Sequence, residues 1–295
     1  MKPNASPKQD LTKNNQPARS IQKQLGEEIS PFSESPYLDS LVLLSHITGF
    51  TKSQLLAGRE PVLTEEQRNQ LSRALTQLKE GVPLPYVLGE WEFYQRSFKV
   101  TKDVLIPRPE TEGLVDITLA WLKDHPHQRD LLEIGTGCGC IAITLAKMIP
   151  DLMITATDIS PRALVVAREN SLQHQTEGQI HFKERDLLTG LDIQVDLIVA
   201  NLPYIPTGKL RTLPVYTREP ILALDGGADG LFYIKKVLKS ARNHIRPGGA
   251  IFLELDEDSG AAALTLAREV WPGMTLKLRR DLAGQDRYLS IQCRS

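Results

Sequence analysis

From residue 131 to residue 292, short apolar runs alternate with longer stretches of helical pattern, and this alternation restricts the fold more than any other feature. The runs have the length of β-strands, and such an alternation is typical of a doubly wound sheet whose strands are mostly parallel. We expect strands over residues 131–134, 154–158, 179–183, 195–200, 250–255, 275–279 and 287–292. Helices are expected between most of them, for example over residues 141–149, 161–173 and 232–245.

The last two expected strands are separated only by residues 281–286, which are too few for a crossover helix. Parallel strands need such a crossover, whereas antiparallel strands can be joined by a short turn. The sequence therefore predicts an α/β domain over residues 109–295, in which a doubly wound sheet ends in an antiparallel C-terminal hairpin.

The part of the chain before this domain has a different pattern. Residues 1–20 are rich in Lys, Asn, Gln, Ser and Pro and lack the apolar segment of a secretory signal, so we expect a disordered tail. A transit peptide is an alternative for this tail. Residues 21–82 predict a small all-helical domain, in which Thr64 and Gln67 form a capping box. Residues 83–108 predict a linker with a short hairpin.

Composition disfavours several classes of protein. The 35 basic and 36 acidic residues leave a net charge of −1, so no direct nucleic-acid binding is expected. No apolar run reaches the roughly 18 residues of a membrane span, so no membrane association is expected. Three cysteines, an odd and sparse count, suit a reducing cytoplasm better than a disulfide framework. Two of them, Cys138 and Cys140, have no further Cys or His at ligand spacing, so we expect no metal site.

A glycine-rich loop, Glu133-Ile134-Gly135-Thr136-Gly137-Cys138-Gly139, follows the first expected strand and opens a helix. Glycines let the backbone turn tightly and approach a ligand closely. The position where a dinucleotide fingerprint has its third glycine is Cys140, which weakens an NAD interpretation. A tight strand–helix turn without a ligand is the alternative.

Asp158 ends the second expected strand, and Asp186 follows the third. Asp158 can accept hydrogen bonds from both hydroxyls of a ribose, or it can cap the helix that begins at Pro161. Ser160 is better placed for the cap, which leaves Asp158 free. Asp186 could accept from the amino group of adenine or could be an ordinary turn residue, and Leu187 beside it would cover the adenine ring.

The tetrapeptide Asn201-Leu202-Pro203-Tyr204 comes directly after the expected strand 195–200. It therefore falls at the carboxyl end of a strand, where parallel sheets bind their ligands. An Asn side chain can both donate to and accept from a planar amide or amine, and a Tyr ring can stack on a flat group.

This tetrapeptide resembles the Asn-Pro-Pro-Tyr signature of methyltransferases that act on planar nitrogens, with Leu202 in place of the first Pro. The glycine loop and the acid that precedes it resemble the S-adenosylmethionine loop of class I methyltransferases. The order of the motifs is similar to that of the HemK/PrmC family, and the motifs occupy residues 106–112, 133–139, 201–206, 222–231 and 281–287.

The resemblance implies a class I S-adenosylmethionine-dependent methyltransferase fold and an N5-glutamine methyltransferase that acts on the GGQ motif of class I peptide-chain release factors in the cytoplasm. It implies that the helical domain recognises the substrate. It assigns the cofactor S-adenosyl-L-methionine to Gly135, Thr136, Gly137, Cys138, Gly139, Asp158, Leu187 and Asn201, with Asp186 as a further candidate. It assigns the catalytic site to Asn201, Leu202, Pro203 and Tyr204.

Within this site, the resemblance implies that the Asn201 side-chain oxygen and the Leu202 backbone carbonyl accept the two N–H groups of the target amide. Two alternatives stay open on the sequence. One is a nucleic-acid adenine-N6 methyltransferase, which shares the tetrapeptide chemistry. The other is a non-catalytic protein that keeps the fold and binds a partner.

Overall fold

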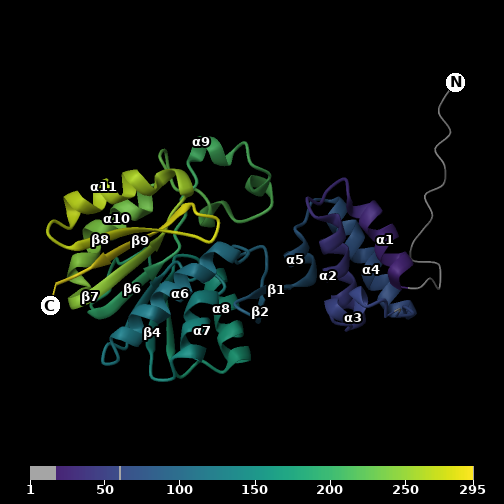
Figure 1. Ribbon diagram of the computed structural model, residues 1–295, viewed down its shortest axis with the longest axis horizontal. Helices are drawn as coiled ribbons and strands as arrows, with labels where there is room; N and C mark the ends of the chain where they lie inside the picture. The colour runs from purple at the N-terminus through teal and green to yellow at the C-terminus, as the bar shows by residue number, and fades with distance from the viewer. Residues whose placement is uncertain (1–17, 60, 295) are drawn as a thin grey trace. The chain divides into compact units, whose positions relative to one another are not determined.

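The computed structural model describes residues 18–59 and 61–294 and divides at Gly89/Glu90 into two compact units (Figure 1). Residues 1–17 of the tail predicted over 1–20 lie outside the described residues. Ala18, however, already begins the first helix. No helix in the described part of the chain has both the length and the apolar character needed to cross a bilayer.

The first unit is helical, as the sequence predicts. Its helices are α1 (Ala18–Ile29), α2 (Pro36–Thr48), α3 (Lys52–Leu56), α4 (Glu65–Lys79) and α5 (Leu84–Leu88). Thr64 and Gln67 form the predicted capping box at the start of α4, with each side chain accepting from the backbone N–H of the other. One apolar core, which includes Leu25, Leu44 and Leu71, holds these helices together.

The hairpin of β1 (Glu90–Phe93) and β2 (Arg96–Lys99) begins the second unit. Asn170, which is fully buried on α8 (Pro161–His174), fixes the end of this hairpin. Its side chain accepts from the Lys99 backbone N–H at 2.7 Å and donates to the Lys99 carbonyl at 3.0 Å. The segment predicted as a linker therefore contains α5 in the first unit and a hairpin that is attached to the second.

The second unit is built on a seven-stranded sheet in the order β5-β4-β3-β6-β7-β9-β8. The predicted doubly wound sheet is confirmed, because β5, β4, β3, β6 and β7 are paired in parallel. The predicted antiparallel hairpin of β8 and β9 is also confirmed, and β9 inserts between β7 and β8. The strands are β3 (Asp130–Ile134), β4 (Met153–Asp158), β5 (Ile180–Glu184), β6 (Val195–Ala200), β7 (Ile245–Glu254), β8 (Thr275–Arg280) and β9 (Asp286–Gln292).

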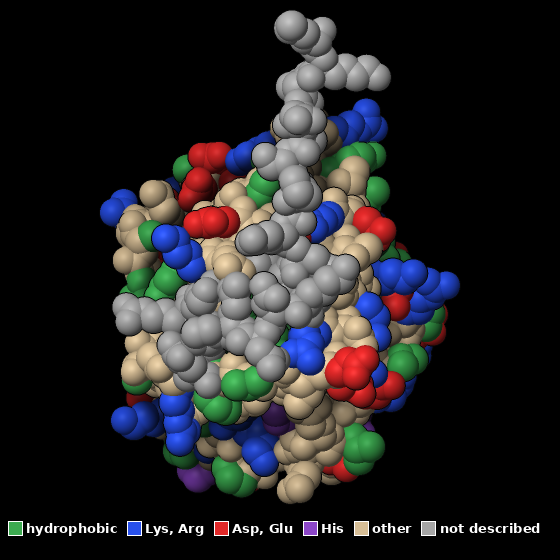
Figure 2. Space-filling view, turned by 90° about the vertical axis from the view of Figure 1, so that its right-hand side faces the viewer, with side chains coloured by type: hydrophobic (Ala, Val, Ile, Leu, Met, Phe, Trp, Pro, Cys, Tyr) green, Lys and Arg blue, Asp and Glu red, His purple; other side chains and the backbone are tan. Residues whose placement is uncertain are grey.

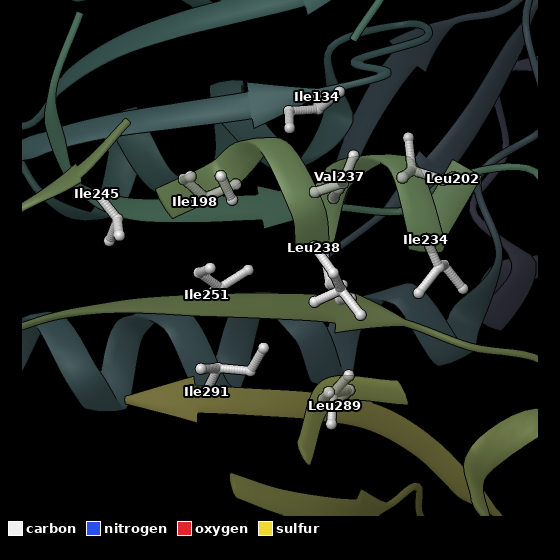
Figure 3. Packing of buried hydrophobic residues seen from close by; sticks show 14 of the residues in the cluster. Ile134, Ile198, Leu202, Ile234, Val237, Leu238, Ile245, Ile251, Leu289 and Ile291 are labelled. Atoms are coloured by element: carbon white, nitrogen blue, oxygen red, sulfur yellow. The ribbon is translucent and has the colours of Figure 1, made fainter. Parts of the chain in front are cut away.

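Helices cover both faces of this sheet (Figure 1). On one face lie α6 (Pro109–Asp124), α7 (Cys140–Met148) and α8, and on the other lie α10 (Phe232–Ser240) and α11 (Gly260–Val270). Figure 3 shows the core under α10, where Val237 and Leu238 pack over Ile198 of β6 and Ile251 of β7. Because both faces are buried, all six residues of β6 are buried.

The surface drawn in Figure 2 carries basic and acidic side chains interspersed with hydrophobic ones.

Glycine at position 113 allows α6 to pack closely against β9. A Cβ atom there would lie 2.1 Å from the Tyr288 hydroxyl, which donates to the Glu110 carbonyl at 2.6 Å.

We expect Gly113→Ala to displace Tyr288 and to lower the free energy of unfolding by about 1–3 kcal/mol. Gly178→Ala is the matched control, because no atom lies within 4 Å of a Cβ there, and its effect should stay within about 0.5 kcal/mol. Denaturant unfolding of both variants measures the difference, and equal stabilities would contradict the role of Gly113.

Candidate functional site

The glycine loop and the Asn201 tetrapeptide meet because β3 and β6 are neighbouring parallel strands. Ile134 pairs with Ala200 at the end of both strands, so Gly135 and Asn201 leave the sheet side by side. A Cβ atom on Gly135 would lie 3.4 Å from the Leu202 side chain and 3.6 Å from the Asn201 carbonyl. The sheet also changes winding direction here, since β4 lies on one side of β3 and β6 on the other. Such a switch point is where doubly wound sheets bind ligands.

The loop after β3 uses glycine where other residues would be strained. Gly135, Gly137 and Gly139 have φ of 74°, 57° and 84°, in the left-handed region. The backbone N–H groups of Gly135 and Thr136 both donate to the Thr157 carbonyl of β4, at 2.8 and 2.9 Å. The loop is therefore held in a tight turn with its backbone exposed to the crevice.

Asp158 at the end of β4 faces this loop. Its Oδ2 accepts from the Gly137 N–H at 2.9 Å and its Oδ1 accepts from the Ser160 N–H at 2.8 Å. Burial raises the pKa of the carboxyl, and these two backbone donors partly offset that effect. Ser160 caps α8 by accepting from the Ala163 N–H, as predicted, and Asp158 does not take the place of this cap.

A cavity of about 230 Å³ opens at this crevice, entirely within the second unit. It brings together most of the residues assigned to the cofactor and the target, namely Gly135, Gly137, Asp158, Asp186, Leu187, Asn201, Leu202 and Pro203. Leu187 has a φ of 53°, which is uncommon for a residue with a side chain and is typical of functional sites. Tyr233 of α10 adds an aromatic side chain to the lining that the sequence did not identify.

Three residues of the glycine loop lie behind the lining of this cavity. The Thr136 hydroxyl donates to the buried Glu133 carboxylate at 2.6 Å. The Cys138 side chain is buried, and its carbonyl accepts from Asn170 at 2.8 Å. Gly139 is the N-cap residue of α7, and a Cβ atom there would lie 2.9 Å from Ile143. These three residues contact the protein interior, so they hold the conformation of the loop and do not line the cavity.

A second cavity of about 290 Å³ adjoins the first. It is lined largely by apolar residues, and Tyr204 and Arg108 also line it. Asn201 and Leu202, together with Leu105 and Ala223, line both cavities, so the two cavities adjoin at these residues. A ligand in one cavity would therefore lie next to a ligand in the other.

The segment that contains Gly226 and Gly230 holds the tetrapeptide in place. A Cβ atom on Gly226 would lie 2.7 Å from the Tyr204 Cα, and one on Gly230 would lie 2.3 Å from the Tyr204 carbonyl oxygen. The Ile205 N–H donates to the Leu224 carbonyl at 3.0 Å, and the Gly226 N–H donates to the Ile205 carbonyl at 2.8 Å. The glycines of the motif at 222–231 therefore allow a close backbone contact with Tyr204.

Besides Tyr233, the sequence analysis missed Thr111 and Glu254, which contact the tetrapeptide. The Asn201 side-chain N–H donates to the Thr111 hydroxyl at 3.0 Å, and the Tyr204 hydroxyl donates to the Glu254 carboxylate at 3.3 Å. Burial raises the pKa of Tyr204, so its hydroxyl stays a neutral donor. Glu254 could have been noticed as the acid that interrupts the apolar run 250–255.

Arg108 forms an ion pair with the nearly buried Glu219 beside the second cavity. Glu219 also accepts from the Ile106 N–H at 3.1 Å, which fixes the chain that leads into α6. In residues 18–59 and 61–294, no cluster of three His, Cys, Asp or Glu side chains is arranged to hold a metal ion.

The first cavity fits an adenosyl cofactor by its chemistry. Asp158 offers acceptors for ribose hydroxyls, and the positive-φ glycines leave a backbone surface free of Cβ atoms. Leu187 and Tyr233 offer apolar contact for a flat base.

We expect Asp158→Ala to weaken binding of S-adenosylmethionine by about 1–3 kcal/mol, because a partner for the ribose and for the Gly137 N–H is lost. Titration calorimetry measures the change. Asp192→Ala, which removes an exposed acid outside the cavity, is the control and should leave the affinity unchanged. Unchanged affinity in the Asp158 variant would contradict the assignment.

Both units of the chain match known protein families in sequence. A sequence model described as the PrmC N-terminal domain matches residues 21–89, and one described as the methyltransferase small domain matches residues 115–216. The crystal structure of a methyltransferase from Pyrococcus furiosus has the same fold, with a TM-score of 0.51, 18% identity and coverage of 79% of this chain and 100% of that one.

Two relatives extend the similarity over most of the chain. The release factor glutamine methyltransferase of Moorella thermoacetica is 39% identical over 273 residues, which cover 90% of this chain and 96% of the relative. That of Rhodopirellula baltica is 37% identical over 268 residues, with coverage of 88% and 90%. At this identity and coverage, the chain belongs to the release factor glutamine methyltransferase family.

Proposed function

We propose that this protein transfers a methyl group from S-adenosylmethionine to the side-chain amide nitrogen of the glutamine in the GGQ motif of class I release factors. The observation that carries the proposal is that Asn201 and Leu202 line both cavities, so the same two residues would face the cofactor and the target amide. Family membership supplies the identity of the substrate. We place the reaction in the cytoplasm, where release factors act on ribosomes.

S-adenosylmethionine supplies an electrophilic methyl group when it is bound in the first cavity. Asp158 would hold its ribose, Asp186 and Leu187 would contact its adenine, and the backbone of Gly135 and Gly137 would approach it closely. These residues come from the ends of three neighbouring strands, β3, β4 and β5, so the sheet itself positions them.

The protein must also orient a weak nucleophile, because the lone pair of an amide nitrogen is delocalised into its carbonyl. The Asn201 Oδ1 atom and the Leu202 carbonyl would each accept one N–H of the target amide, and Tyr204 would pack on the amide plane. Two acceptors restrain the nitrogen and favour a geometry in which its lone pair points toward the first cavity. Such alignment is worth up to about 7–11 kcal/mol of the barrier in ideal cases.

The decisive test is methyl transfer from labelled S-adenosylmethionine to a purified class I release factor, with the modified residue located by mass spectrometry. We expect one methyl group on the GGQ glutamine. A methylated adenine in added nucleic acid, with an unmodified release factor, would instead favour the adenine-N6 alternative. Cofactor binding without transfer to either substrate would favour a non-catalytic protein.

Asn201→Ala should reduce kcat strongly, by about a hundredfold or more, while cofactor affinity changes much less. The reason is that the contact of Asn201 with the target amide strengthens mainly as the reaction proceeds. Single-turnover kinetics and calorimetry separate the two effects. A variant with normal kcat would show that another group orients the amide.

Leu202→Pro is a contrasting variant, because it restores the Asn-Pro-Pro-Tyr signature and keeps the backbone carbonyl of residue 202. The Leu202 side chain is 4% exposed and belongs to the core under α10. We therefore expect a loss of about 1–3 kcal/mol of stability with kcat similar to wild type. A folded Leu202→Pro protein that binds cofactor but is inactive would contradict the role of the carbonyl.

We also propose that the helical unit recognises the release factor, because it has its own core and matches the family's N-terminal domain. Removal of residues 1–89 should raise KM for the intact release factor by roughly tenfold or more. Cofactor affinity should stay near wild type, because the residues of the first cavity all belong to the second unit. Equal KM values for the truncated and full-length proteins would place recognition in the second unit.

A further inference from the structure

Arg108 is the one charged side chain among the described residues that line the second cavity. The rest of the lining is apolar except for Asn201 and Tyr204, which belong to the tetrapeptide. The Arg108 side chain keeps 32% of its surface exposed, so a molecule that enters the cavity can reach it. The reaction as proposed needs only the orientation of an amide and gives this cation no role.

Glu219 fixes the position of Arg108. Its side chain is buried, and one carboxylate oxygen forms the ion pair with Arg108 Nη2. The other carboxylate oxygen accepts from the Ile106 N–H at 3.1 Å. The Glu219 backbone is held as well, because its N–H donates to the Val215 carbonyl at 3.0 Å. The guanidinium is therefore attached to an acid that cannot itself move freely.

Most N–H groups of Arg108 are left for a ligand. A guanidinium carries five N–H groups in a planar fork. Within residues 18–59 and 61–294, the hydrogen bond to Glu219 is the one that this guanidinium makes. The remaining N–H groups are free to donate into the second cavity. Such a fork can donate to two oxygen atoms that lie side by side.

The proposed substrate offers acceptors that match this fork. Two glycines precede the target glutamine, and without side chains their main-chain carbonyl groups can be approached closely. These carbonyls lie next to the second cavity when the glutamine side chain reaches Asn201 and Leu202. A backbone carbonyl oxygen has two lone pairs and accepts readily from a guanidinium.

The side-chain oxygen of the target glutamine is the other acceptor that the substrate brings to this cavity. A cation that donates to this oxygen would draw the nitrogen lone pair further into the carbonyl and weaken the nucleophile. Glu219 opposes that effect, because its negative charge balances the charge of Arg108. A guanidinium that contacts the main chain instead aids binding and leaves the reactivity of the amide unchanged.

We propose that Arg108 is a substrate-binding residue, whose guanidinium donates to the main-chain carbonyl groups of the two glycines that precede the target glutamine. Glu219 is then a positioning residue, because it acts through Arg108. The proposal rests on the proposed function and extends it from the glutamine side chain to the adjoining main chain. It assigns Arg108 an effect on KM, in contrast to the effect of Asn201 on kcat.

The experiment compares Arg108→Lys with wild type in the release-factor assay. The variant keeps a positive charge beside Glu219 but loses the planar fork. We expect KM for the release factor to rise by about fivefold or more, with kcat within about threefold of wild type. The melting temperature should stay near wild type, because the ion pair can still form. Affinity for S-adenosylmethionine should also be unchanged, since Arg108 does not line the first cavity.

A pair of neutral variants separates binding from stability. Arg108→Gln should raise KM by about tenfold or more, and it should also melt at a lower temperature because Glu219 is left as an unpaired buried acid. Arg108→Gln combined with Glu219→Gln removes both charges and should regain the lost stability. The double variant should keep the raised KM, because the stability of the ion pair is not the source of the effect.

Arg246 provides the matched control. It is also partly exposed, and it pairs at 3.0 Å with a nearly buried acid, Asp196. This pair lies at the start of β6, at the opposite end of the strand from Asn201. Arg246→Lys should therefore leave both KM and kcat at their wild-type values.

Ionic strength distinguishes a carbonyl acceptor from an acidic side chain of the release factor. Salt screens a contact between two exposed charges more than a contact with a neutral carbonyl. The ratio of KM between the double variant and wild type should therefore change less than about twofold between low and high ionic strength. A ratio that falls to about one at high ionic strength would assign Arg108 to an acidic partner and would overturn the proposal.

Wild-type KM in Arg108→Lys would show that Arg108 only pairs with Glu219, and this result would also overturn the proposal. So would a fall in kcat with unchanged KM, because it would place Arg108 on the side-chain oxygen of the glutamine. Methylation of the glutamine by the wild-type protein tests the proposed function, while KM ratios between variants and wild type test Arg108, so the two can fail separately.

Discussion

The parallel pairing of β3 with β6 is the constraint on which the site depends. Because Ile134 and Ala200 are partners, the two strands end at the same level, and Gly135 and Asn201 emerge next to each other. Only a glycine loop allows this approach with a φ of 74° at its first residue. The position of Asn201 and Leu202 in the lining of both cavities then follows from this register, since the two residues continue directly from β6.

The register alone would leave the tetrapeptide as a free loop, and three further contacts restrain it. Gly226 and Gly230 pack against the backbone of Tyr204, Leu202 is buried in the core, and Thr111 holds the Asn201 amide. These contacts come from segments far apart in the sequence. A site built in this way is preorganised, which is what alignment of a weak nucleophile requires.

Local patterns in the sequence predicted the helices and strands, whereas long-range packing determined the side-chain contacts of the site. The expected strand over 195–200 and the capping box of Thr64 were found because their signals lie within a few residues. The contact of Thr111 with Asn201 spans 90 positions, and no periodicity encodes it. Likewise, Leu38 fits the helical spacing of α2 but is 52% exposed, because the helix turns Leu41 and Leu44 into the core instead. The spacing of apolar residues identifies a helix, whereas packing against the neighbouring helices decides which of its faces is buried.

The two buried acids show that the site is maintained at a cost in stability. Burial raises the pKa of Glu133 from 4.5 to about 8 and that of Glu254 from 4.5 to about 7. Between these values and 4.5, the folded state binds more protons than the unfolded state, so the free energy of unfolding falls as the pH rises through this range. The ionised form of Glu254 is therefore the form that destabilises the fold. An apolar residue at position 254 would relieve that cost, so core packing gives no reason for an acid at this position, where the Tyr204 hydroxyl donates to it at 3.3 Å.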